Sequence, residues 1–123
     1  VTVQTAGIQS GTVTCNYAWQ DITTVTFNPE GGGYVIQFSS QCNLLDDSRV
    51  TLQMLIGSTV VKTWVTGMRA DSGVSVEGEM SSVMNYAVSS SSGAITAKVQ
   101  VKKLTSGGMT VTNGVITADG AKK

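Results

Sequence analysis

The sequence predicts an all-β fold, a single-domain antiparallel sandwich or barrel of about eight to ten short strands. Valine, threonine, serine and glycine make up half of the 123 residues, and the first two favour extended backbone. Apolar and polar residues alternate with a period of two along nearly the whole chain, and glycine-containing breaks separate the runs. The length fits one domain, residues 1–123, in which the first ten or so residues either join the sheets or extend as an arm.

The individual strands follow from this alternation. Residues 13–19, 34–38 and 50–56 each place apolar side chains on one face, and similar runs continue to residue 118. Gly57-Ser58 between two runs predicts a two-residue hairpin. Residues 44–49 are expected to form one helical turn. The later breaks between runs are residues 89–93, residues 106–108 and Asn113-Gly114.

The only proline stands before a triple glycine, between two apolar runs. Pro29 cannot donate a hydrogen bond to a β-ladder, and Gly31, Gly32 and Gly33 can adopt backbone angles that other residues avoid. This segment therefore predicts a corner, after which the chain re-enters the core with Tyr34.

Residues 32–38 resemble a known family. Gly32, Tyr34 and Phe38 match the Gly-x-Tyr-x-Phe-x-Phe/Tyr strand motif of the jelly rolls related to complement globular heads and tumour necrosis factor, with Ile36 at the middle aromatic position. Phe27 is similar to the aromatic of the preceding strand in that family. Residues 107–118 look like the last strands of jelly-roll modules in bacteriophage fibres and capsid appendages. The resemblance implies a jelly-roll β-sandwich.

The resemblance also implies a function. Such units are usually trimers that pack through sheet edges and aromatic faces, and they bind or support other proteins. We therefore expect a non-enzymatic bacteriophage virion protein, a capsid decoration protein or a small fibre or head module, located in the virus particle. It would form a homotrimer and contact other virion proteins. The alternative is a receptor- or carbohydrate-binding module, a tail-fibre tip or a secreted lectin-like domain that binds a host-surface glycan or protein.

Five residues are candidates for an interface or a ligand contact. Tyr34 and Phe38 belong to the aromatic motif. Trp64 lies either in the core or on the surface, where it would form a sugar platform or a subunit anchor. Lys98 and Lys102 alternate with apolar residues and are expected on an exposed face, either as a contact or as charged protection of a sheet edge.

Charge, the length of apolar runs and the lack of histidine exclude several classes of function. Formal net charge is zero and 13% of residues are charged, so no basic footprint for nucleic acid is present. Residues 1–61 are net acidic and residues 62–123 net basic, a polarity that either helps like subunits pack or is ordinary solvated charge. Apolar runs are too short for membrane insertion. Without histidine, the usual serine or cysteine catalytic pairs are missing.

Two further pairs of side chains each allow two interpretations. Glu77 and Glu79 share one strand face, as acid/base catalysis would need, but apolar residues on the opposite face place both glutamates toward water. Cys15 and Cys42 form either a disulfide or two buried thiols on neighbouring strands. No cofactor and no metal site is predicted.

Overall fold

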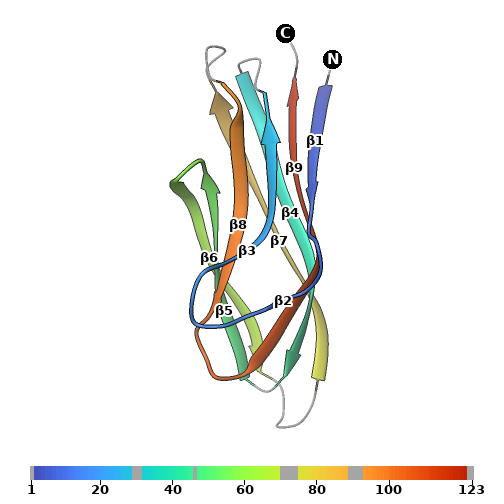
Figure 1. Cartoon of the computed structure of the whole chain (residues 1–123), viewed down its shortest axis with the longest axis vertical. Helices are drawn as coiled ribbons and strands as arrows, with labels where there is room; N and C mark the ends of the chain where they lie inside the picture. Colours follow the sequence, from blue (N-terminus) through green and yellow to red (C-terminus); the bar gives the residue numbers. More distant parts are fainter. Residues whose placement is uncertain (1, 29–31, 46, 70–74, 89–92, 122–123) are drawn as a thin grey trace.

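The structure is a computed structural model that describes residues 2–28, 32–45, 47–69, 75–88 and 93–121. These residues contain β-strands and no helix, which confirms the all-β prediction (Figure 1). The strands are β1 (Thr2–Ile8), β2 (Val13–Thr14), β3 (Gln20–Phe27), β4 (Gly32–Leu45), β5 (Asp47–Ile56), β6 (Thr59–Arg69), β7 (Ser75–Val88), β8 (Ile95–Lys103) and β9 (Gly108–Ala121).

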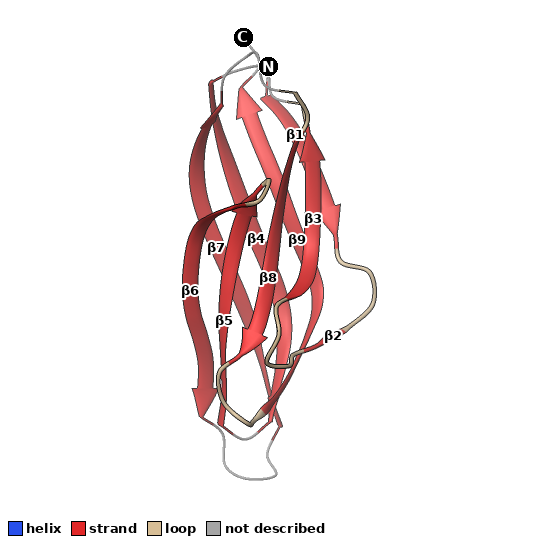
Figure 2. Cartoon of the chain, turned by 60° about the vertical axis from the view of Figure 1, so that its left-hand side comes forward, coloured by secondary structure: helices blue, strands red, loops and turns tan. Residues whose placement is uncertain are grey.

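The strands form two antiparallel sheets that pack face to face (Figure 2). Sheet A has the order β1-β9-β4-β7, with β2 also paired to β9, and sheet B has the order β3-β8-β5-β6. Among the eight longer strands, the first pairs with the last, the second with the seventh, the third with the sixth and the fourth with the fifth. This nested pairing describes a rolled antiparallel ribbon, so the molecule is a jelly-roll-like β-sandwich.

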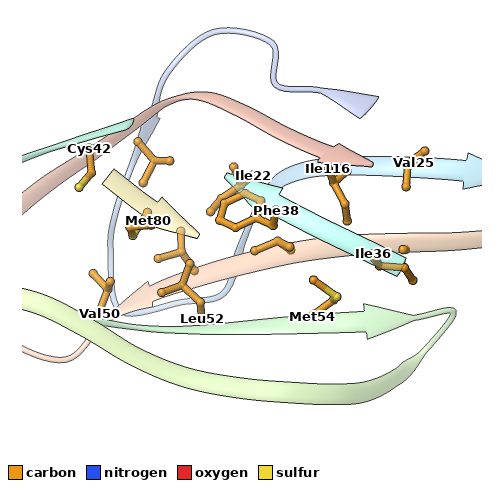
Figure 3. Close-up of a cluster of buried hydrophobic side chains, with 14 of the residues drawn as sticks. Ile22, Val25, Ile36, Phe38, Cys42, Val50, Leu52, Met54, Met80 and Ile116 are labelled. Carbon is orange, nitrogen blue, oxygen red and sulfur yellow. The ribbon is translucent and has the colours of Figure 1, made fainter. Parts of the chain in front are cut away.

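The core lies between the two sheets (Figure 3). Alternate residues of β4 point inward from sheet A, and alternate residues of β5 and β8 point inward from sheet B. The largest fully buried side chains include Phe38, Ile36, Leu52, Met54 and Ile116. Burial of such apolar side chains stabilises the fold by about 1.5–3 kcal/mol each.

One side of the sandwich is closed by β1 and β3. β1 pairs with β9 from Thr2 to Ile8, so the N-terminal residues are a strand of sheet A rather than an arm. Gly7 permits the close approach of β1 to β3, because a Cβ atom there would collide with the backbone of Thr24. On the other side, β6 and β7 are the free edge strands of the two sheets (Figure 2).

One local prediction holds and one fails. Ile56 pairs with Thr59 across Gly57-Ser58, and Gly57 has a φ of 63°, which confirms the two-residue hairpin. The helical turn expected at residues 44–49 is wrong, because β4 extends to Leu45 and β5 begins at Asp47. The buried hydroxyl of Ser48 is satisfied within this strand, because it shares its one proton between the carbonyl oxygens of residues 45 and 108, at 2.8 and 2.7 Å.

The predicted corner lies partly outside the described residues. Pro29 to Gly31 fall in the gap before β4, while Gly32 has a φ of 94°, a backbone angle that favours glycine. Residues 89–92 of the predicted serine-rich loop also lie outside the described residues.

Candidate functional site

The outer face of sheet A is hollowed where β7, β4 and β9 lie side by side. Two rows of paired polar side chains cross these strands: the first row is Glu77, Asn43 and Thr110, and the second is Glu79, Gln41 and Thr112. Together they line a hollow of about 360 Å³, which we call the polar hollow. The side chains reach the outer face because each alternates along its strand with a residue that points inward.

The polar hollow continues along the same strands. A second hollow of about 320 Å³ shares Gln41 and Glu79 with the first. A third hollow of about 230 Å³ shares Ser39 and Ser81 with the second. The third hollow ends at Val83 and Thr117. Amide, hydroxyl and carboxylate groups therefore line one end of a shallow, open channel, which becomes more apolar toward the other end.

A bulge in β9 completes the middle of this channel. Asn113 and Gly114 together face Ser40, so the register of β9 against β4 shifts by one residue. Asn113 has a φ of 55°, and its Nδ2 donates to Oε1 of Gln41 at 2.6 Å. The prediction that this Asn-Gly pair separates two strands is wrong, because β9 continues through it as one strand.

A second exposed cluster lies on sheet B, beside the loop between β2 and β3. Lys102 Nζ is 4.8 Å from the ring centroid of Trp19, and Lys103 Nζ is 5.0 Å from that of Tyr17. Both distances are in the range of a cation–π interaction. Tyr17 is 62% exposed. We call these four residues the aromatic–lysine cluster.

Lys98 belongs to a polar chain on the outer face of sheet B. Its Nζ is 3.7 Å from Asp21 Oδ1, and Gln100 Nε2 donates to the same oxygen at 2.7 Å. Gln53 on β5 donates in turn to Gln100 at 2.7 Å. Edge protection by Lys98 and Lys102 is ruled out, because β8 lies between β3 and β5 in the interior of sheet B.

The three predicted aromatic residues face the core side of the sandwich. Tyr34 and Phe38 are 5% and 1% exposed, so their rings contact other core residues within the chain. Trp64 is half-buried, and its ring centroid lies 6.4 Å from that of Phe38. Of the two alternatives for Trp64, the structure shows core packing. The five predicted site residues do not converge on one site.

The free edges of β6 and β7 form a third surface. Val65 on β6 is 61% exposed and Val83 on β7 is 54% exposed. Lys62 links the two edges, because its Nζ donates to the carbonyl oxygen of Val83 at 3.0 Å. The two strands therefore leave long backbone edges available on the same side of the molecule (Figure 2).

Cys15 and Cys42 are buried free thiols rather than a disulfide. The expectation that both lie on neighbouring strands is wrong, because Cys15 follows β2 and only Cys42 lies within a strand. Burial, followed by the nearby Cys42, raises the pKa of Cys15 to a net value of about 11, although Lys103 partly opposes both effects. Burial also raises the pKa of Cys42, against a hydrogen bond from the backbone of Gly78. Both groups are therefore neutral thiols at physiological pH, a state of low nucleophilicity.

Sequence reasoning placed Glu77 and Glu79 on the water side, and both are exposed there. It missed the rest of the polar hollow. The pattern that could have indicated the hollow lies in β4, where polar residues alternate with buried ones; they are Gln37, Ser39, Gln41 and Asn43. Uncharged polar residues are typical of any solvated face, so this pattern gains meaning only when neighbouring strands are known.

No protein-family model matches the chain, and no curated protein does. Among the described residues, no group of three or more histidine, cysteine, aspartate or glutamate side chains could hold a metal ion. The described part of the chain also contains no helix long and apolar enough to cross a membrane.

Proposed function

We propose that this chain is a non-enzymatic structural protein of a bacteriophage particle, a capsid decoration protein or a small fibre or head module. It forms a homotrimer and contacts other virion proteins. The jelly-roll-like pairing of the strands and the resemblance of residues 32–38 to the complement-head and tumour-necrosis-factor jelly rolls support the proposal. In such a role, the protein bridges neighbouring shell subunits and adds buried area at their contacts.

The pair of free edge strands carries the proposal. Edge strands present unpaired N–H and C=O groups, which can pair with a strand of another chain. β6 and β7 are 11 and 14 residues long, and each exposes a valine. Charged side chains commonly protect such an edge. On β7 the exposed glutamates, Glu77 and Glu79, lie toward the start of the strand, whereas Val83 lies beyond them and its carbonyl oxygen accepts a hydrogen bond from Lys62. This side of the molecule therefore suits contact between subunits.

The test is solution mass, measured by light scattering after size exclusion at several concentrations. We expect three times the 12.8 kDa of one chain. The Val65→Lys and Val83→Lys variants should lower this mass, because a lysine at each edge opposes strand pairing. Ile8→Lys on β1 is the matched control, since Ile8 is also exposed but lies at the opposite side. A monomer at every concentration would contradict the proposal.

The polar hollow favours a second candidate, a receptor- or carbohydrate-binding module. Open, shallow surfaces lined by amides, hydroxyls and carboxylates can make several hydrogen bonds to a hydroxyl-rich ligand. A glycan array distinguishes the two candidates, because saturable binding by a monomer favours the binding module and counts against the structural role.

A further inference from the structure

We propose that the polar hollow binds a linear oligosaccharide that is neutral or carries amino groups, and that it rejects acidic sugars. The ligand lies along β4 on the outer face of sheet A. This inference rests on the second candidate function, glycan binding, and does not depend on self-association.

The spacing of the side chains suits a chain of linked sugar rings. Neighbouring strands lie about 4.8 Å apart, and side chains on one face repeat about every 7 Å along a strand. The six residues of the two rows therefore form a regular grid across β7, β4 and β9. From Asn43 to Gln37 the connected hollows extend about 20 Å along β4, the length of a few linked sugar units.

The grid offers both kinds of hydrogen-bonding group. Glu77 and Glu79 accept hydrogen bonds, Thr110 and Thr112 can donate or accept, and the amide of Gln41 does both. Asn113 fixes that amide by donating to its Oε1, so the Nε2 group is directed to other acceptors. Sugar hydroxyls also donate and accept, and vicinal hydroxyls present these functions in pairs. A pre-oriented amide loses little freedom when such a ligand binds.

The charge of sheet A determines which sugars can bind. Its described strands contain Glu77, Glu79 and Asp119 but no lysine or arginine. The described basic residues lie on strands of sheet B; they are Arg49, Lys62, Arg69, Lys98, Lys102 and Lys103. An anionic sugar over the glutamates would meet like charge without a compensating cation on this face, whereas an amino group would be attracted.

The experiment begins with the whole chain on an array of linear neutral, amino-bearing and acidic oligosaccharides. Calorimetric titrations then use three tetramers, of β-1,4-linked glucose, glucosamine and glucuronic acid. We expect binding to the array's neutral or amino-bearing members, tighter binding of the glucosamine tetramer than of the glucose tetramer, and no binding of the glucuronic acid tetramer. The inference is overturned if the protein binds no neutral or amino-bearing oligosaccharide, or if it prefers acidic ones.

Variants locate the site. Gln41→Ala should weaken binding about tenfold or more, the loss of one or two hydrogen bonds. Glu79→Gln should reduce the preference for glucosamine, because only Glu77 then remains as a carboxylate in the hollow, whereas binding of the glucose tetramer should persist. Asn85→Ala is the matched control, because Asn85 is exposed on β7 but does not line the hollows. Thermal melting checks that each variant is folded.

Two results separate failure of the site from failure of the function. If Gln41→Ala binds normally and Trp19→Ala does not, the protein binds glycans through the aromatic–lysine cluster, and the inference about the polar hollow is overturned. If no glycan binds at all, both the inference and the carbohydrate-binding form of the second candidate function are overturned. A separate measurement of the mass of the protein in solution shows whether it self-associates.

Discussion

At the residue scale, burial of Cys15 makes stability depend on pH in the alkaline range. The pKa of Cys15 is about 11 in the folded chain against an ordinary value of 9.0. Between these values the unfolded chain loses a proton that the folded chain retains, so rising pH favours unfolding. We expect the free energy of unfolding to fall by about 2–3 kcal/mol from pH 9 to pH 11, as measured by urea denaturation at each pH.

The control for this prediction is Cys15→Ala. That variant is less stable overall because it leaves a small cavity, but its stability should decline less steeply over the same pH range. Equal slopes for the two proteins would show that other groups, such as lysines and tyrosines, account for the decline.

Gly7 illustrates a residue whose importance the sequence does not reveal. We expect Gly7→Ala to destabilise the fold by about 2 kcal/mol or more, because the new methyl group collides with the backbone of Thr24 and β1 must move away from β3. Gly33→Ala is the matched control: Gly33 also lies in a strand, but a Cβ atom there has no neighbour within 4 Å. Thermal unfolding of both variants tests the difference, and equal midpoints would contradict the close packing of β1 on β3.

At the scale of elements, β9 shows what alternation can and cannot predict. Asn113-Gly114 is a sequence typical of a tight turn, but here it forms a bulge. The same residue types serve both structures, because both need a positive φ. Only the neighbouring strand distinguishes them: β4 pairs with β9 on both sides of the bulge.

The bulge yields a prediction about Asn113. Its φ of 55° is tolerated by asparagine and glycine but disfavours β-branched residues. Asn113→Gly should change stability by less than about 1 kcal/mol, whereas Asn113→Val should destabilise the protein by about 1–3 kcal/mol. Urea denaturation measures both changes. If valine is tolerated as well as glycine, residue 113 does not have a positive φ in solution.

β4 shows how far the candidate site could be predicted from the sequence. Its alternation correctly predicts that Tyr34, Ile36 and Phe38 share a face, and the structure shows that this face is the core. The partners of β4 could not be predicted, because β7 and β9 lie far from it in the sequence. The polar hollow depends on those pairings, so only its glutamates could be assigned to the surface in advance.

At the scale of the whole molecule, charge is separated by sheet rather than by sequence half. The acidic and basic halves of the sequence contribute strands to both sheets, since β1 pairs with β9 and β3 with β8. The sheets nevertheless differ: the described strands of sheet A hold three acidic and no basic residues, whereas those of sheet B hold six basic and two acidic ones. Two opposite surfaces of unlike charge could therefore attract each other between copies.

Salt dependence distinguishes this attraction from contact through the edge strands. Contact through β6 and β7 relies on backbone hydrogen bonds and valine side chains, which salt weakens little, whereas attraction between exposed charges is largely screened at about 0.5 M NaCl. We expect the trimer mass to be the same at about 20 mM and about 0.5 M NaCl, as measured by light scattering. A mass that falls with salt, and that falls likewise in the Glu77→Gln, Glu79→Gln double variant at low salt, would assign the contact to sheet A facing sheet B. Because those two surfaces lie on opposite sides of each subunit, such a contact would build open chains rather than a closed trimer.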